Sequence, residues 1–257
     1  MIDTGDGRVK LSVDGAIATV TLARVEKLNA LDFAMIQALE RAAHLIDANQ
    51  AVRVAIITGE GEKAFCAGGD IAAWSKQAPE DFGLQWVRVG HRAFDALTRL
   101  RQPLIAALNG SALGGGLELA ACADFRVGEA HIKIALPETS IGIIPGWSGT
   151  QRCVKRFGSQ IVRRLSLLGE VLTAEQALAT GVIDRMIAKG AGLNAAKELA
   201  TQMLARSGLA TSAAKMMINA ADDEDAARSI EALAGTAVGH SAELKQGLAA
   251  FKSKIKK

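Results

Sequence analysis

The stretch Asn109-Gly-Ser-Ala-Leu-Gly-Gly-Gly-Leu-Glu-Leu119 combines a turn signal, three consecutive glycines and a short apolar segment that contains one acid. It follows the apolar run Leu104 to Leu108, which predicts a buried strand. Glycines placed where a strand gives way to a helix permit close approach of another backbone or of a ligand. The first N–H groups of such a helix lack partners, and the helix dipole adds partial positive charge there. The stretch therefore predicts a phosphate or oxyanion site, with a tight turn that only packs helix on strand as the alternative.

The glycine spacing excludes two common nucleotide-binding loops. No Gly-Lys-Ser/Thr follows the glycines, so the stretch is not a P-loop. It also lacks the spacing of a dinucleotide fingerprint and comes late in the domain.

Strand and helix patterns alternate on both sides of this stretch. The order of strand, helix, strand, loop, helix, strand and helix predicts the α/β class, with loops meeting at one edge of the strands. The expected strands are Lys10–Val13, Ala16–Leu22, Val52–Thr58, Leu104–Leu108, Phe125–Val127 and Ile132–Leu136, and the expected helices are Asp32–Asn49, Leu84–Leu100 and Leu117–Cys122.

The chain changes character after about residue 147. Thr173-Ala-Glu-Gln176 is a capping box, Gly181 is a candidate C-terminal cap, and Val182 to Ile187 predicts one last short strand. From Ala195 onward the pattern is helical in period. We therefore expect an α/β core over residues 1–190 and a helical C-terminal region over residues 191–257. A helical extension rich in Ala and Leu needs a partner surface, so we expect an oligomer.

Composition limits the class of protein. The 257 residues are 49% hydrophobic with a formal charge of +3, which suits a folded domain and an anionic small ligand without requiring nucleic acid. Three cysteines without a CxxC pair argue against disulfides and structural zinc. No signal peptide and no membrane span is recognisable, so we expect a soluble cytoplasmic protein.

Two acids stand beside glycine-rich loops. Glu118 lies between Leu117 and Leu119 in a segment that otherwise reads as buried, where a carboxylate is unfavourable unless it is paired or used. Glu138 follows Pro137 in a loop. The alternatives are a solvent-facing Glu118 and a Glu138 that only caps a turn. Together the two acids suggest paired carboxyls that divide acid and base roles.

A second loop, Lys63-Ala-Phe-Cys-Ala-Gly-Gly-Asp-Ile71, offers further backbone donors. The alternative is an ordinary loop before a helix with Asp70 as its N-cap. Cys66 is interpreted as a small buried thiol rather than a nucleophile, because no histidine stands in a recognisable frame with it.

These motifs together resemble the crotonase superfamily, the enoyl-CoA hydratase and isomerase family. The resemblance covers nearly the whole chain, from Arg24-Val-Glu-Lys-Leu-Asn-Ala-Leu31 to Phe251-Lys-Ser-Lys254. The two acids are 20 residues apart, as in true hydratases, and Ile143-Ile-Pro-Gly-Trp-Ser-Gly-Thr-Gln-Arg152 is also typical of them. The resemblance implies a spiral of ββα units with a helical C-terminal trimerisation region, often assembled as a dimer of trimers.

The resemblance also implies roles for individual residues. The N–H groups of Gly69 and Gly115 would form an oxyanion hole for the thioester oxygen. Glu118 would hold and deprotonate water, and Glu138 would deliver a proton to the α-carbon. The residues expected to bind the coenzyme A portion are Lys27, Leu28, Ala67, Gly68, Asp70, Ile71, Phe251 and Lys254, the last two reaching a neighbouring subunit.

The resemblance implies no metal and no separate cofactor, because coenzyme A is part of the acyl-CoA substrate. It implies an enoyl-CoA hydratase of fatty acid β-oxidation. A Δ3,Δ2-enoyl-CoA isomerase or another acyl-CoA lyase of the same fold is the enzyme alternative. Branches with a catalytic tyrosine are disfavoured because the chain has none, and isomerases usually lack the first acid. RNA binding is disfavoured because Arg41, Arg53 and Lys63 are isolated.

Two details of the sequence qualify the resemblance. Ala72 stands where many hydratases have a basic residue near the adenine, so Lys76 is a candidate replacement. The aromatic residues Trp74, Phe82, Trp86 and Trp147 either shape an acyl pocket or simply pack in the core.

Overall fold

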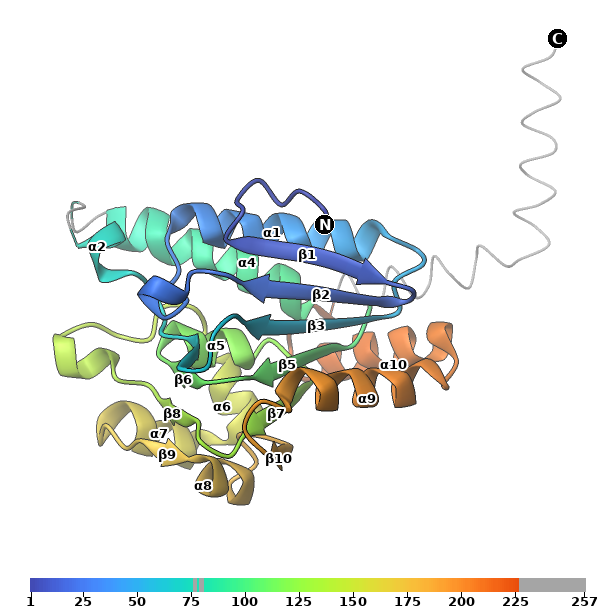
Figure 1. The fold of residues 1–257 in the computed structure, drawn as a ribbon. Coiled ribbons are helices and arrows are strands. Elements are labelled where there is room, and N and C mark those ends of the chain that lie inside the picture. The colour runs from blue at the N-terminus through green and yellow to red at the C-terminus, as the bar shows by residue number, and fades with distance from the viewer. Residues whose placement is uncertain (76–77, 79–80, 227–257) are drawn as a thin grey trace, which may run out of the picture.

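The structure is a computed structural model, which describes residues 1–75, 78 and 81–226. Two sheets form its centre, with helices around them (Figure 1). The larger sheet has the order β1-β2-β3-β5-β7-β10 and the smaller one the order β4-β6-β8-β9. The strands of the larger sheet are β1 (Val9–Asp14), β2 (Ile17–Leu22), β3 (Val54–Gly59), β5 (Leu104–Leu108), β7 (Phe125–Glu129) and β10 (Arg185–Ile187). Those of the smaller sheet are β4 (Ala64–Cys66), β6 (Ser111–Leu113), β8 (Lys133–Ala135) and β9 (Leu172–Thr173).

Successive strand pairs pass from the larger sheet to the smaller one and so build a spiral. β3 is followed by β4, β5 by β6 and β7 by β8, and each member pairs in parallel with its counterpart in the next turn. Helices α2 (Ile71–Trp74), η2 (Phe82–Val87) and α4 (Arg88–Thr98) follow β4, and α5 (Gly115–Ala120) follows β6. The expected α/β class and the spiral of ββα units are confirmed.

The N-terminal hairpin is the predicted one. β1 and β2 pair antiparallel around Asp14 and Gly15, and Gly15 has φ +57°, a conformation that glycine adopts without strain. Helix α1 (Phe33–Ala48) begins as expected, because the Asp32 side chain accepts a hydrogen bond from the Met35 N–H. The short turn η1 (Val25–Lys27) lies between β2 and α1.

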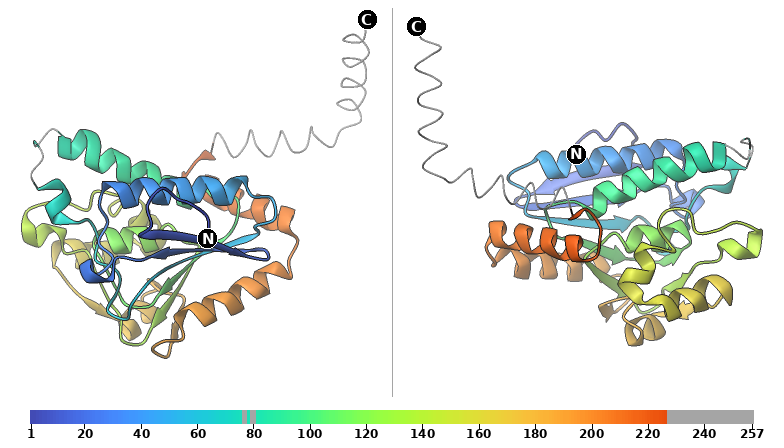
Figure 2. Two further views of the ribbon diagram at one scale, coloured as in Figure 1. Left: turned by 45° about the horizontal axis from the view of Figure 1, so that its top comes forward. Right: turned by 180° about the vertical axis from the view of Figure 1, so that it is seen from behind.

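The central strands are buried on both faces, which explains their unbroken apolar sequences. Alternate residues of a strand face opposite sides of the sheet. In β5, Leu104, Ala106 and Leu108 join the larger core, which α1 and α4 cover, while Ile105 and Ala107 join a second core. Helix α9 (Gly192–Leu204) covers that second face, and α1 and α4 run side by side on the first (Figure 2).

The later part of the chain supplies η3 (Glu138–Ile141), α6 (Arg152–Phe157), α7 (Ser159–Leu167), α8 (Ala174–Ala179) and α10 (Gly208–Ala221). The capping box at Thr173 is present in full, and Gly181 has φ +75° just after α8. Helix α10 is tied to the body by Lys215, whose ammonium lies 2.8 Å from the Asp124 carboxylate. Within the described residues, no helix has both the length and the apolarity needed to cross a bilayer.

The sequence did not indicate the small-sheet strands β4 and β6, which it left as loop and turn. Both contain only three residues, too few for a recognisable alternation. The helix expected from Leu84 to Leu100 is confirmed in outline, but it starts as the π-helical segment η2, which ends at Val87. Widened π-helical turns change which side chains face a neighbouring cavity.

Candidate active site

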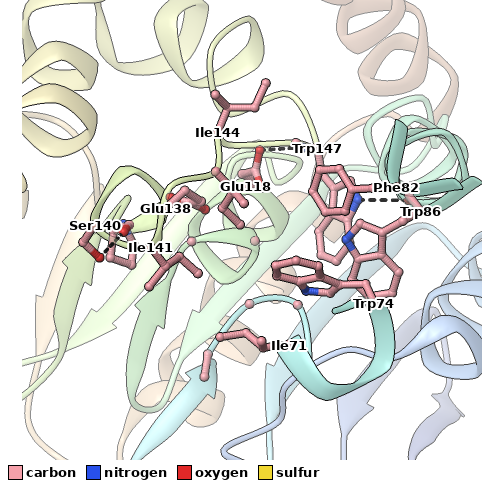
Figure 3. Close-up of a pocket in the computed structure, with 18 residues that line it drawn as sticks. Ile71, Trp74, Phe82, Trp86, Glu118, Glu138, Ser140, Ile141, Ile144 and Trp147 are labelled. Atoms are coloured by element: carbon pink, nitrogen blue, oxygen red, sulfur yellow. Dashed lines mark hydrogen bonds between the residues drawn. The ribbon is translucent and has the colours of Figure 1, made fainter. Parts of the chain in front are cut away.

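A pocket of about 300 Å³ opens between the two glycine loops and the segment from residue 137 to 147. Figure 3 shows the two predicted acids near each other in it, with Phe82, Trp86 and Trp147 on one side and Ile141 on the other. The lining residues are Ala67, Gly68, Gly69, Ile71, Trp74, Phe82, Trp86, Gly114, Gly115, Glu118, Pro137, Glu138, Ser140, Ile141, Ile143, Ile144, Gly146 and Trp147. The sequence-predicted acids and glycines therefore meet in one cavity.

Gly69 and Gly115 both present backbone to this pocket. Leu31 pairs with Gly69 through the neighbouring groups, because its N–H donates to the Gly68 carbonyl and its carbonyl accepts from the Asp70 N–H. That pattern leaves the N–H of Gly69 on the side away from Leu31. Gly115 is the first residue of α5, so its N–H has no partner within the helix.

The two loops approach each other too closely for side chains. A Cβ on Gly68 would lie 2.9 Å from the Leu113 carbonyl oxygen and 3.0 Å from the Gly115 nitrogen, and Gly68 also has φ +94°. A Cβ on Gly116 would lie 2.0 Å from the Cys66 carbonyl oxygen. The glycines thus have both a structural and a potential binding role, and the two interpretations of the sequence are compatible.

Glu118 points inward from α5 and is only 2% exposed, which excludes the solvent-facing alternative. Its Oε1 accepts hydrogen bonds from the Trp147 N–H at 2.7 Å and from the Gly149 N–H at 2.6 Å. Ser148, between these donors, has φ +79°, and successive N–H groups in such a turn form an anion-binding concavity. The loop therefore holds the carboxyl in one orientation.

Glu138 begins η3 and lies over the turn at Gly114. A Cβ on Gly114 would lie 2.6 Å from Glu138 Oε1, and Gly114 has φ +54°. Glu138 is 8% exposed, and its buried Oε2 has no hydrogen-bond partner among the described residues. Its carboxyl is thus less restrained than that of Glu118.

Burial perturbs both carboxyls, and the charge of Glu138 also acts on Glu118. Burial, followed by repulsion from the Glu138 charge, raises the pKa of Glu118 to about 8, although the two N–H donors and the Arg152 guanidinium act in the opposite direction. Burial also raises the pKa of Glu138. Near neutral pH the pair therefore retains a proton, which is the condition for one member to act as an acid and the other as a base.

Aromatic rings form the buried end of the pocket. Trp86 and Trp147 are 4% and 3% exposed, and their ring centroids are 5.0 Å apart. Trp74 packs on Phe82 nearer the surface, also at 5.0 Å. These residues line the pocket and pack on the core at once, so the two interpretations of the aromatics again hold together.

Of the residues expected at the coenzyme A portion, Ala67, Gly68 and Ile71 line the pocket, and Leu28 and Asp70 lie next to them. Leu28 is 44% exposed, and its carbonyl accepts a hydrogen bond from the Ala67 N–H. Asp70 caps α2 at the Ala72 N–H and forms an ion pair of 2.8 Å with Arg24. Ile71 is 52% exposed at the pocket edge.

Lys27 is exposed at the end of η1, next to Leu28. Phe251 and Lys254, together with Lys76, lie outside the described residues.

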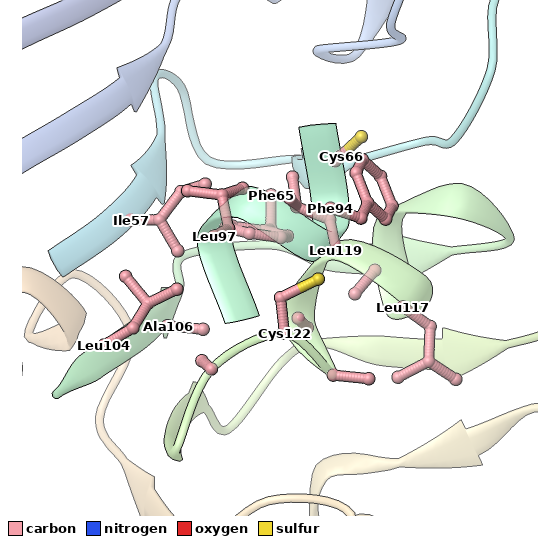
Figure 4. Packing of buried hydrophobic residues seen from close by; sticks show 14 of the residues in the cluster. Ile57, Phe65, Cys66, Phe94, Leu97, Leu104, Ala106, Leu117, Leu119 and Cys122 are labelled. Atoms are coloured by element: carbon pink, nitrogen blue, oxygen red, sulfur yellow. The ribbon is translucent and has the colours of Figure 1, made fainter. Parts of the chain in front are cut away.

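Cys66 is fully buried, and Figure 4 shows it beside Phe94 in the core. Burial raises the pKa of its thiol to about 12. A thiol of this kind is not a nucleophile at neutral pH, in agreement with the sequence interpretation.

The sequence did not indicate two residues that interact with Glu118, namely Arg152 and Gly149. Arg152 is 3% exposed and holds Asp95 at 2.7 Å and Glu224 at 2.9 Å. Its guanidinium is one of the groups that lower the pKa of Glu118. The Gly149 N–H bond to Glu118 was also missed. The quoted 143–152 motif contains both residues, but nothing in it indicates which groups turn toward the acid.

Comparison with known proteins gives one consistent result. The family model described as enoyl-CoA hydratase/isomerase matches residues 12–257. A crotonyl-CoA hydratase of Syntrophomonas wolfei is 33% identical over 96% of this chain and 95% of its own. A carnitinyl-CoA dehydratase of Salmonella arizonae is 40% identical over 80% of this chain and 78% of its own. The crystal structure of an enoyl-CoA hydratase from Bacillus anthracis superposes with a TM-score of 0.81 at 30% identity, covering 96% of each chain.

Proposed function

The chain belongs to the enoyl-CoA hydratase/isomerase family, and from this premise we propose that it is an enoyl-CoA hydratase. The reaction is the addition of water across the 2,3-double bond of a 2-trans-enoyl-CoA. The observation that carries the proposal is the presence of two buried carboxyls, Glu118 and Glu138, in one pocket with the backbone of Gly69 and Gly115.

The glycine backbone suits the charge that develops in this reaction. Addition of a nucleophile at C3 moves the π electrons toward the thioester oxygen. In the proposed complex the N–H groups of Gly69 and Gly115 donate to that oxygen. Donors fixed in a buried site stabilise such an oxyanion by roughly 3–4 kcal/mol each. Their position in a tight crossing of two loops removes the need for reorganisation during the reaction.

The two glutamates divide the proton transfers. Glu118 takes a proton from water while the new C3–O bond forms and the π pair moves to the enolate. Glu138 then gives its proton to C2, and the carbonyl is restored. Glu118 ends protonated and Glu138 ionised, and exchange with water returns the shared proton for the next cycle.

The hydrogen bonds support this division of roles. Two backbone N–H groups donate to Glu118 Oε1, which favours the charged form of that carboxyl. Glu138 Oε2 has no described donor, so in the proposed reactive form the shared proton lies on Glu138, although burial raises the pKa of Glu118 to about 8. In this arrangement Glu118 is the base and Glu138 the acid.

The acyl-CoA substrate brings the coenzyme A portion with it, and the proposal needs no metal and no separate cofactor. The exposed residues Lys27, Leu28 and Ile71 are proposed to contact that portion together with Ala67, Gly68 and Asp70. Phe251 and Lys254 are proposed to complete it from a neighbouring subunit of a homotrimer or a dimer of trimers. Exposed apolar side chains such as Leu167, Leu168 and Met217, 71%, 78% and 63% exposed, support an oligomer. Light scattering that gave the mass of one chain would contradict it.

The second candidate is a Δ3,Δ2-enoyl-CoA isomerase, which needs one base only. It is favoured by the raised pKa of Glu118, because a protonated Glu118 cannot deprotonate water. A Glu118→Gln variant separates the two reactions. With crotonyl-CoA we expect hydration to fall by about 10²–10⁴-fold, while conversion of a 3-enoyl-CoA through Glu138 largely survives. Fast isomerisation by a wild-type enzyme that does not hydrate crotonyl-CoA would select the isomerase.

The proposed hydratase fits a step of fatty acid β-oxidation in the cytoplasm. Fractionation of cells that express the chain would test the location, and growth on a fatty acid without the gene would test the pathway.

A further inference from the structure

The pocket has an open end and a closed end, which exposure distinguishes. Ile71, Ile141 and Ile144 at the open end are 52%, 55% and 67% exposed. At the other end Trp86 and Trp147 are almost completely buried. A ligand that enters past these exposed isoleucines therefore meets the buried indole rings of Trp86 and Trp147 last.

The closed end lies against the groups that are proposed to hold the thioester. A Cβ on Gly115 would lie 2.7 Å from the six-membered ring of Trp147, and one on Gly69 would lie 2.8 Å from that of Trp86. The backbone N–H of Trp147 also donates a hydrogen bond to Glu118 Oε1. The same rings therefore border the site where the acyl chain begins, within contact distance of the glycine backbone.

The ring of Trp147 is held by contacts on several sides. Its Nε1–H donates to the Trp86 carbonyl at 3.4 Å, and Phe94 packs edge-on against it with centroids 5.2 Å apart. Phe33 supports Trp86 in the same way at 4.9 Å. Displacing the ring of Trp147 or Trp86 would break these contacts. An acyl chain therefore does not readily displace either ring.

Gly90 provides the space that this ring occupies. A Cβ on Gly90, the third residue of α4 and interior to the continuous helical segment that η2 begins, would lie 2.0 Å from Trp147 Nε1 and 2.2 Å from Cδ1. Glycine is unfavourable in a helix interior, and Gly90 has no positive φ that would require it. The close approach of Trp147 accounts for its presence, so the two residues form a matched pair.

We propose that Trp147, seated on Gly90 and braced by Trp86, closes the acyl end of the pocket and limits the enzyme to short apolar acyl groups. The proposal rests on the proposed acyl-CoA function and adds the substrate class to it. Apart from Glu118 and the glycine backbone, the described residues at this end present hydrocarbon and indole surface, which suits an apolar chain.

The test is calorimetric titration with the saturated thioesters butyryl-, hexanoyl-, octanoyl- and decanoyl-CoA, which bind without turnover. For the wild type we expect affinity to stop rising after the short chains. In Trp147→Ala the ratio of octanoyl-CoA to butyryl-CoA affinity is expected to rise by about tenfold or more, because each added methylene can then be buried. Trp74→Ala, a matched substitution nearer the surface, is expected to keep the wild-type ratio.

An unchanged ratio in a folded Trp147→Ala protein would overturn the proposal. If that variant does not fold, as judged by its circular dichroism, Trp147→Leu retains apolar bulk and is expected to shift the ratio in the same direction by less. If affinity depends on acyl length as predicted but crotonyl-CoA is not hydrated, the proposed hydratase activity is contradicted and this inference still holds. A wild-type protein that binds none of the thioesters would contradict both the proposed hydratase activity and the proposed limit on acyl length.

Discussion

Glu118 and Glu138 line the same pocket, but the regions that hold them are built differently. Glu118 stands on a helix of six buried residues, and a loop with two N–H donors grips one of its oxygens. Glu138 stands on a short turn at the open side, with one buried oxygen free of partners in the described part of the chain. This contrast agrees with the proposed roles, in which the first carboxyl orients water and the second transfers a proton.

The largest expected effect separates the two acids by proton exchange. In deuterated water, Glu138→Gln is expected to slow exchange of the α-protons of butyryl-CoA by about 10²–10⁴-fold, since the only group proposed to reach that carbon is lost. Glu118→Gln is expected to retain most of the exchange. Mass spectrometry of the recovered thioester measures both. Equal losses in the two variants would show that the acids do not have separate roles.

The two backbone hydrogen bonds to Glu118 can be disturbed without changing any charge. A Cβ on Gly149 would lie 2.7 Å from Glu118 Oε1 and 2.5 Å from the Pro145 side chain, so Gly149→Ala must displace the carboxyl or the loop. We expect hydration to fall by about 10²-fold, as for other small misplacements of reacting groups.

Gly146→Ala is the matched control in the same loop, because its Cβ would make only an ordinary contact at 3.5 Å. Hydration rates of crotonyl-CoA compare the two variants. A Gly149→Ala protein as active as Gly146→Ala would show that the fixed orientation of Glu118 is unimportant.

The sequence predicted the elements of the fold well wherever a local pattern was long enough. The hairpin at Asp14-Gly15 and the cap at Asp32 follow from local chemistry and were correct. Strand β6 carries only three residues between two glycine turns, so its pairing depends on neighbours far away in the chain. Short strands of this kind are determined by tertiary contacts.

The candidate site could be predicted in part. The acids and glycines were recognisable because their residue types carry chemistry. The support that Arg152 gives to Glu118, and the space that Gly90 leaves for Trp147, bring together residues 34 and 57 positions apart. No local sequence pattern encodes such contacts. A single glycine in a predicted helix, such as Gly90, is only a weak indication that another side chain packs against it.

The aromatic end of the pocket predicts an effect on stability. Gly90→Ala alone is expected to lower the free energy of unfolding by about 1–3 kcal/mol, because the new methyl group overlaps a ring that cannot move freely. In a Trp147→Ala background the same substitution is expected to be neutral or stabilising, since the overlap is gone. Urea denaturation of the four proteins gives the coupling. If the two substitutions change the free energy of unfolding additively, Gly90 and Trp147 do not form a matched pair.

The buried acid also predicts a pH dependence of stability. Because the pKa of Glu118 is raised to about 8 in the folded protein, the folded state binds more protons than the unfolded state above the unfolded value of about 4.3. The wild type therefore loses stability relative to Glu118→Gln as pH rises from about 5 to 8, and the loss is complete above the folded pKa. Melting temperatures of both proteins across this interval measure it. A constant difference would show that Glu118 is not perturbed by burial.

The most direct test of the proposed hydratase is the loss of the conjugated-enoyl absorbance of crotonyl-CoA, followed for the wild type and for Glu138→Gln side by side. We predict rapid loss with the wild type and a rate at least about 10²-fold lower with the variant. Unchanged absorbance with a wild type that binds butyryl-CoA would contradict hydration, and equal rates for the two proteins would contradict the role of Glu138.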